Sequence, residues 1–198
     1  MVGEPLSNSW ITVEDGRIKA VGKSNDDLRP GIDLGSVAVI PGLVNAHTHL
    51  ELSHLRGCVP RSRHFIDWVR SLILNRNKFH GRNNLKIEQA AINGIKEAKA
   101  SGTALVGDIS NTLLTIKLMH EASLGGVVFH ELLGFDITEV KSFIREARTK
   151  VDMLPVFSDI RISLAPHAPY SVPVAMFQEI RRDLDAHPDV VTSVHLGE

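Results

Sequence analysis

Two histidines separated by one residue, His47 and His49, are the first side chains in this 198-residue chain that could do chemistry. Residues two apart on a β-strand point to the same face, so both imidazoles could bind one metal ion. The pair follows a mostly apolar run, residues 37–46, that contains Pro41-Gly42. Two ordinary histidines at a strand end would show the same spacing, so the spacing alone leaves both interpretations open.

A second polar group, His195-Leu196-Gly197-Glu198, follows the strand-like residues 190–194. In a parallel barrel, catalytic groups collect at the carboxyl ends of the strands, so His195 would face the first histidine pair. A third candidate, His167, lies between two prolines at the end of the strand predicted over residues 161–165. The alternative for both histidines is an ordinary loop residue with satisfied hydrogen bonds.

The elements that must position these groups alternate between strands and helices. Strands are predicted over residues 103–108, 127–132, 161–165 and 190–195, after a first buried strand that leads into His47. Helices are predicted over residues 64–79, 85–100, 113–123, 138–149 and 174–184. This alternation is typical of βα units around a parallel sheet. Roughly five strands are present, whereas a closed barrel of this kind has eight, so we expect an incomplete α/β barrel.

The beginning of the chain has a different pattern. Residues 10–22 predict a β-hairpin, because apolar and polar residues alternate on both sides of Asp15-Gly16, which suits a tight turn. We therefore expect two domains, residues 1–40 with a small sheet and residues 41–198 with the barrel strands.

Composition narrows the classes of partner. The chain has 43% hydrophobic and 23% charged residues and a net charge of -1, which predicts no nucleic-acid partner and favours a small molecule. No apolar run approaches the roughly 20 residues that cross a bilayer, so no membrane partner is expected. Cys58 is the single cysteine and no charged leader precedes an apolar stretch, so we expect a cytoplasmic protein.

The histidine motifs together resemble those of the amidohydrolase superfamily. Residues 41–49 are similar to its first barrel strand, residues 165–171 to its fourth, and His195-x-x-Glu198 to the fifth strand of its deaminases. The resemblance implies a TIM (β/α)8 barrel cut short after about five strands, with residues 1–40 as part of a flanking β-sandwich. It also implies that His47, His49 and His195 bind metal, Glu198 shuttles protons and His167 contacts substrate.

Weaker similarities point to the aminofutalosine deaminases within this superfamily. Residues 51–53, residues 65–68 and residues 130–134 carry them. They imply that Trp68 and Glu131 bind substrate, although Trp68 could be a helix-packing residue and Glu131 a structural carboxylate. The chain departs from relatives that place a ribose-binding glutamate after the tryptophan, because Asn75-Arg76 stands there.

The function that the resemblance implies is hydrolytic deamination of an amino-substituted heterocycle, such as an aminopurine, an adenosine-like nucleoside or aminofutalosine. One divalent metal is expected, zinc first and iron second, and residues 161–171 contain no lysine that could bridge a second ion. The alternatives are hydrolysis of a cyclic amide, a chlorotriazine or a guanidine, or an inactive fragment. We expect the 198-residue chain alone to bind metal weakly and not to turn over. Family members of this type commonly pair, so the resemblance allows a homodimer of a full-length protein but leaves its oligomeric state open.

Overall fold

The computed structural model describes residues 3–23, 31–79 and 84–196. Its contacts divide the chain into two compact units, Met1–Ile40 and Pro41–Glu198. Glu198, the predicted proton shuttle, lies outside the described residues.

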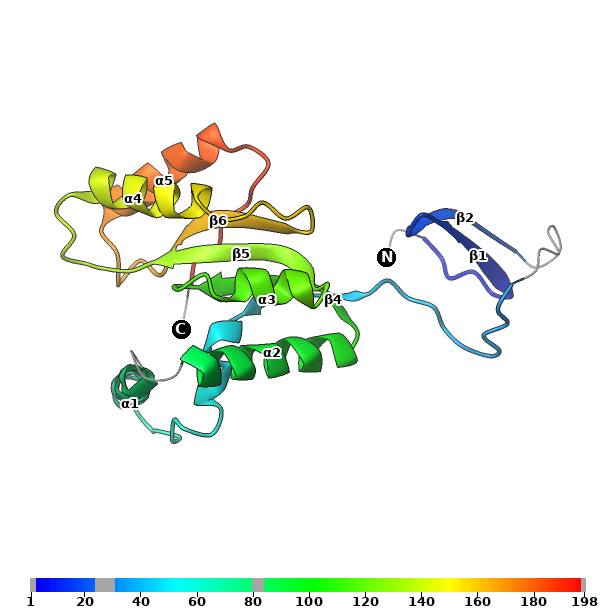
Figure 1. Ribbon diagram of the computed structural model, residues 1–198, viewed down its shortest axis with the longest axis horizontal. Coiled ribbons are helices and arrows are strands. Elements are labelled where there is room, and N and C mark those ends of the chain that lie inside the picture. The colour runs from blue at the N-terminus through cyan, green and yellow to red at the C-terminus, as the bar shows by residue number, and fades with distance from the viewer. Residues whose placement is uncertain (1–2, 24–30, 80–83, 197–198) are drawn as a thin grey trace. The chain divides into compact units, whose positions relative to one another are not determined.

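The first unit contains a two-stranded antiparallel sheet, β1 (Ser9–Glu14) and β2 (Arg17–Lys23) (Figure 1). Asp15 and Gly16 form the turn with φ angles of 50° and 71°. Both angles are positive, as a tight hairpin turn requires, and glycine adopts such an angle without a steric cost. Trp10 Nε1 donates a hydrogen bond across the pair to the carbonyl oxygen of Lys23 at 3.1 Å. The predicted hairpin is confirmed, and its place in a larger β-sandwich stays a prediction.

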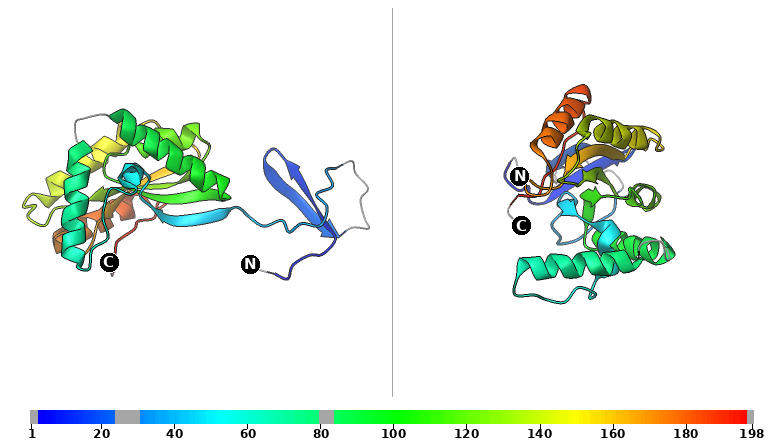
Figure 2. Two further views of the ribbon diagram at one scale, coloured as in Figure 1. Left: turned by 90° about the horizontal axis from the view of Figure 1, so that it is seen from below. Right: turned by 90° about the vertical axis from the view of Figure 1, so that its left-hand side faces the viewer.

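The second unit alternates strands and helices along the chain. A parallel sheet in the order β3-β4-β5-β6 forms its centre. Figure 2 shows helices along one side of this sheet, and their buried residues share one hydrophobic core with the strands. The elements are β3 (Leu43–Thr48), the 3-10 helix η1 (Leu50–Leu55), α1 (Phe65–Phe79), α2 (Asn84–Ala100), β4 (Thr103–Ser110), α3 (Thr115–Glu121), β5 (Gly125–Leu132), α4 (Val140–Asp152), β6 (Ile160–Pro166) and α5 (Val174–Ala186).

Alternate strand residues pack on opposite faces of this sheet. Val128 and Leu164 are fully buried in the main hydrophobic core, which also contains the buried residues of α2 to α5. Ile109 and Phe129 form a smaller cluster on the other face. Because side chains alternate along a strand, Glu131 points to the same side as Phe129, which is the face away from the helices.

Two expectations about the strands are wrong. The first strand, β3, is not buried: Leu43 is 52% exposed and Val44 is 65% exposed, because among the described strands β3 pairs only with β4 and lies at an edge of the sheet. Residues 190–195 form no ladder of main-chain hydrogen bonds. They run beside β6, where Thr192 Oγ1 donates to the carbonyl oxygen of Leu164 at 2.8 Å and the His195 amide donates to that of His167 at 2.7 Å. The described sheet therefore has four strands rather than five.

The helices lie close to their predicted positions. The largest difference is at α4, predicted over residues 138–149, which runs from Val140 to Asp152. Helix α3, predicted from residue 113, begins at Thr115 because Leu113 has a φ of 65° that no right-handed helix can include. Within the ranges that the structure describes, no helix is both long and apolar enough to span a membrane.

Candidate metal centre

The three predicted metal ligands lie together. The metal-binding atoms of His47, His49 and His195 are all within 4.8 Å of one another. The Nε2 atoms of His49 and His195 are 3.3 Å apart, and the ring centroids of His47 and His195 are 4.9 Å apart. Neutral imidazole nitrogens at this spacing can converge on one divalent ion, so this set of donors fits the cation that the sequence predicts.

The histidines come from opposite margins of the sheet. His47 lies near the end of β3, His49 directly follows it, and His195 ends the segment beside β6. These margins can meet only because the sheet curves, as the strands of a barrel do. His47 is exposed, whereas His195 is only 8% exposed.

Asp108, at the carboxyl end of β4, holds the turn that carries His49. Its Oδ1 accepts hydrogen bonds from Thr48 Oγ1 at 2.9 Å and from the Leu50 amide at 2.8 Å, and its Oδ2 accepts one from Thr115 Oγ1 at 2.7 Å. Complete burial raises the pKa of Asp108 to about 6, although these hydrogen bonds act in the opposite direction. The carboxyl therefore fixes the backbone on both sides of His49.

Glu51 has a similar role two residues beyond His49. Its buried carboxylate accepts hydrogen bonds from Ser110 Oγ at 2.7 Å, from the Asn111 amide at 3.0 Å, and from the amide and hydroxyl of Thr112 at 3.1 and 2.7 Å. Arg76 Nη2 lies 3.6 Å from Glu51 Oε1. Burial would raise the pKa of Glu51, but the hydrogen bonds outweigh it and hold that pKa below its ordinary value.

The predicted substrate-contact residues His167 and Glu131 also lie at this centre. The ring centroids of His167 and His195 are 4.8 Å apart, and His167 Nδ1 lies 2.6 Å from Ser171 Oγ. The metal-binding atoms of Glu131, His167 and His195 form a second group within 4.8 Å of one another. Glu131 itself is 7% exposed.

Trp68, the other predicted substrate contact, lies on a helix rather than at the end of a strand. It belongs to α1, is 38% exposed and stacks on Phe65 with a centroid distance of 6.1 Å. Its predicted contact with substrate stays a prediction, as does the role of Glu198.

Sequence reasoning missed the residues that hold the centre in place, chiefly Asp108 and Asn111. The available signal was the polar run Asp108-Ile109-Ser110-Asn111-Thr112, which follows an apolar strand at the edge where parallel strands end together.

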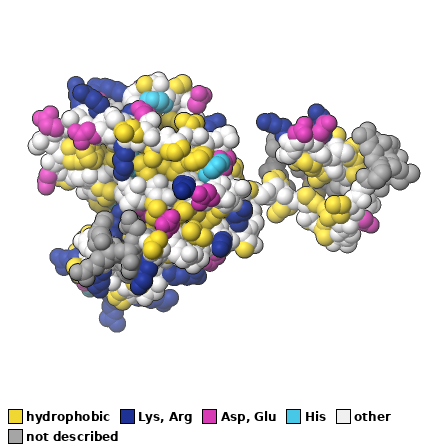
Figure 3. Space-filling model, viewed as in Figure 1, with side chains coloured by type: hydrophobic (Ala, Val, Ile, Leu, Met, Phe, Trp, Pro, Cys, Tyr) yellow, Lys and Arg dark blue, Asp and Glu magenta, His cyan; other side chains and the backbone are white. Residues whose placement is uncertain are grey.

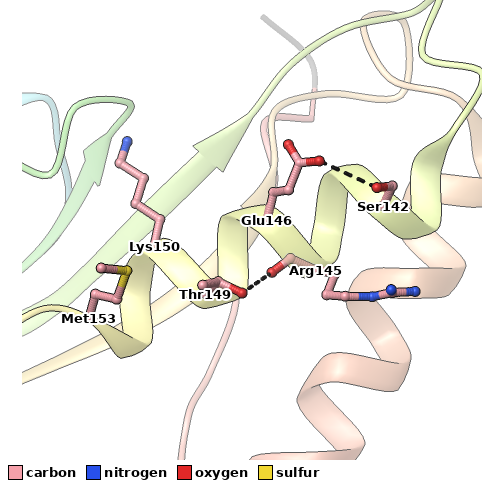
Figure 4. A pocket seen from close by; sticks show the side chains of 6 residues that line it. All are labelled: Ser142, Arg145, Glu146, Thr149, Lys150 and Met153. Carbon is pink, nitrogen blue, oxygen red and sulfur yellow. Dashed lines mark hydrogen bonds between the residues drawn. The ribbon is translucent and has the colours of Figure 1, made fainter.

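Other surface features lie apart from the centre. A shallow hollow runs along α4, and no residue that lines it belongs to the histidine groups: it is lined by Ser142, Arg145, Glu146, Thr149, Lys150 and Met153 (Figure 4). On the face seen in Figure 3, hydrophobic side chains gather in the middle of the second unit and charged side chains lie mostly toward its margin.

The fold is shared with metal-dependent barrel hydrolases. The structure of atrazine chlorohydrolase TrzN from Arthrobacter aurescens TC1, complexed with zinc, superposes with a TM-score of 0.75 and 19% identity over 95% of this chain and 48% of that one. At this identity the likeness shows the fold alone. The four described strands are thus part of a TIM-type barrel.

Residues 38–198 match the amidohydrolase family, and the chain belongs to that family. Adenosine deaminase of Helicobacter pylori is 34% identical over 68% of this chain and 32% of its own length. The 5-methylthioadenosine/S-adenosylhomocysteine deaminase of Pyrococcus furiosus is 30% identical over 98% of this chain and 46% of its own. The structure of Helicobacter pylori aminofutalosine deaminase with methylthio-coformycin gives a TM-score of 0.66 at 30% identity, covering 78% of this chain and 36% of that one.

The chain thus spans between about a third and a half of the length of these curated relatives. The predicted superfamily and its deaminase branch are confirmed by these matches.

Proposed function

We propose that this chain carries the metal-binding portion of a hydrolase that removes the amino group from an adenosine-like compound. The observation that carries the proposal is the convergence of three imidazoles, those of His47, His49 and His195, at the carboxyl end of the sheet. Relatives at about 30% identity named as deaminases of adenosine and 5-methylthioadenosine support the choice of substrate class.

Zinc is the proposed ion and iron the second choice, because three neutral imidazoles suit either. A divalent cation, when bound, supplies Lewis acidity that activates water and polarises the carbon under attack. His47, His49 and His195 would hold it. Solved relatives that contain zinc are in keeping with this choice.

The remaining steps belong to the side chains. Glu198 takes one proton from the attacking water and passes it to a ring nitrogen of the substrate. It then carries the second proton, from the new hydroxyl group, to the amino group, which departs as ammonia. His167, whose Nδ1 faces Ser171 Oγ at 2.6 Å, turns its other nitrogen toward the substrate. Glu131 and Trp68 are proposed to contact the substrate as well. The products are a ring carbonyl and one molecule of ammonia.

The proposal also concerns which group the purine of the substrate carries. Aminofutalosine, which carries a large group on the nucleoside, is one of the expected substrates. Arg76 favours a substrate unlike plain adenosine, because it stands where a ribose-binding glutamate is expected and lies against Asn111 and Glu51 instead.

The test is ammonia release from a panel of adenosine, 5′-deoxyadenosine, 5′-methylthioadenosine, S-adenosylhomocysteine and aminofutalosine, with protein whose metal content has been measured. We expect release from a polypeptide that contains this chain and completes the barrel, loss on chelation and return on adding zinc. Glu198→Gln should lower the rate at least about a hundredfold. Glu97→Gln, an exposed glutamate paired with Arg56, is the matched control and should leave the rate unchanged.

Two results would contradict this proposal: no ammonia from any member of the panel, or full activity after Glu198→Gln. Chloride released from a chlorotriazine, without ammonia from the panel, would favour the alternative hydrolase. The 198-residue chain alone is expected to release no ammonia, because unpaired strand edges leave the barrel incomplete. Ammonia release by this chain alone would contradict that expectation but not the deaminase assignment.

A further inference from the structure

The two ring nitrogens of His195 face different surroundings. Its Nε2 lies 3.3 Å from His49 Nε2, on the side of the histidine cluster. Its Nδ1 lies 3.3 Å from the carbonyl oxygen of His167 and 3.5 Å from Glu131 Oε1. A neutral imidazole carries its proton on one nitrogen only, and the groups around the ring decide which nitrogen that is.

Glu131 is a buried carboxylate with one oxygen engaged. Its Oε2 accepts a hydrogen bond from Asn111 Nδ2 at 3.0 Å, and the same amide nitrogen donates to the Glu131 carbonyl oxygen at 3.0 Å. Among the described residues, Glu131 Oε1 is buried and has no hydrogen-bond partner. A buried carboxylate oxygen is costly unless a donor faces it, and the Nδ1 of His195 is positioned to be that donor.

Asn111 is itself held from two sides. Its Oδ1 accepts a hydrogen bond from Arg76 Nη2 at 2.7 Å, and its main-chain amide donates to Glu51 Oε1 at 3.0 Å. The amide group therefore has one orientation, with its nitrogen toward Glu131. A continuous line of contacts leads from Arg76 on α1 through Asn111 and Glu131 to His195.

We propose that Glu131, held by Asn111 and Arg76, is a positioning residue for the metal ligand His195. By accepting a hydrogen bond from Nδ1–H, the carboxylate keeps the proton on that nitrogen and leaves the lone pair of Nε2 for the cation. It also makes the imidazole a stronger donor to the metal, as carboxylate partners of metal-bound histidines do. The inference rests on the metal centre of the proposed function and gives Glu131 a role beyond contact with substrate.

Zinc affinity, measured by competition with a coloured chelator, is the first test. Loss of the partner of a metal-bound histidine typically weakens metal binding about 10- to 100-fold, and we expect that loss for Glu131→Ala. Glu131→Gln retains an acceptor oxygen and should lose less. Asn111→Ala should weaken binding in the same direction, and the double alanine variant should be no weaker than Glu131→Ala alone, because both act through one contact. Glu97→Ala serves as the control.

The second test determines directly which ring nitrogen of His195 carries the proton. Long-range ¹H–¹⁵N correlation spectra of the imidazoles in the metal-free protein should show His195 with its proton on Nδ1. In Glu131→Ala the fraction of His195 protonated on Nδ1 should fall, because the carboxylate acceptor is lost while the His167 carbonyl oxygen remains. The spectrum of the exposed His120 should not change. Because this measurement needs neither zinc nor turnover, it separates a failure of this inference from a failure of the proposed deaminase.

Unchanged zinc affinity in a folded Glu131→Ala variant would overturn the inference, and so would a wild-type His195 protonated on Nε2. Thermal unfolding followed by circular dichroism verifies folding. If Glu131→Ala does not fold, Glu131→Gln and Asn111→Ala decide the matter by the same two measurements. A merely structural role for Glu131 predicts lower stability without any change in the tautomer.

Discussion

At the scale of single residues, the candidate centre depends on carboxylates as much as on histidines. Asp108 holds the turn that carries His49, and Glu131 faces the ring of His195. An imidazole binds metal only when it is neutral and correctly oriented, so neighbouring acceptors decide how well it binds. Substitutions of these carboxylates therefore test the site without removing any proposed ligand.

Asp108→Asn should change how stability depends on pH. The pKa of Asp108 rises from 3.8 to about 6 on folding, so the folded state binds the proton more tightly than the unfolded state. The stability that this carboxyl contributes is present in acid and is lost as pH rises through about 6. Wild-type protein should lose about 1 kcal/mol from this group between pH 5 and pH 7, and the asparagine variant should not.

Urea unfolding of the metal-free proteins at both pH values measures this difference. Asparagine keeps an acceptor for Thr48 and Leu50, so the variant is expected to fold. Parallel pH dependence in the two proteins would show that Asp108 has an ordinary pKa in the folded chain.

At the scale of elements, the close approach of β3 to β4 positions two of the three histidines. A Cβ atom at Gly107 would lie 2.4 Å from the carbonyl oxygen of Ala46, which is main chain and has no room to yield. Only glycine fits at this point of β4. The contact immediately precedes His47, so strand packing and ligand position are coupled.

Gly107→Ala should therefore damage both stability and metal binding. Overpacking of this kind costs about 1–3 kcal/mol, and the displacement of β3 should weaken zinc binding about tenfold or more. Chemical unfolding and chelator competition provide the two measurements. Gly3→Ala is the matched control, since nothing lies within 4 Å of its new methyl group. Wild-type zinc affinity in Gly107→Ala would mean that β3 holds its histidines independently of β4.

At the scale of the whole molecule, the hydrophobic core belongs to the second unit. Every buried hydrophobic side chain among the described residues lies between Leu50 and Ile180. In the first unit, Val13 and Ile18 are 64% and 67% exposed. An isolated two-stranded hairpin is marginally stable in water, so it contributes little to the stability of the rest of the chain.

A polypeptide of residues 41–198 should accordingly unfold at nearly the same temperature as the entire chain, within about 3 °C. Leu164→Ala provides the comparison, because it removes a fully buried side chain and should cost about 2–5 kcal/mol. Calorimetry or circular dichroism measures both. A fall in Tm as large as that of Leu164→Ala would mean that residues 1–40 belong to the same cooperative unit.

Local pattern by itself determined much of this protein. The turn at Asp15-Gly16, the spacing of His47 and His49 and the alternation of apolar runs with amphipathic helices involve residues close in sequence. Such signals depend on backbone preferences and side-chain periodicity, which hold before the chain folds. They were sufficient to predict the hairpin and the parallel βα order, whereas the family was predicted from the resemblance of the histidine motifs.

Only the tertiary structure decided which polar groups surround the histidines. Glu51 meets Asn111 from 60 positions away, and Asn111 meets Glu131 from 20 positions away. These contacts arise because parallel strands in register end at the same edge of the sheet, and no periodicity along the chain encodes that register. The exposure of β3 and the lack of a regular hydrogen-bond ladder along residues 190–195 have the same origin, since the burial and pairing of a strand depend on its neighbours.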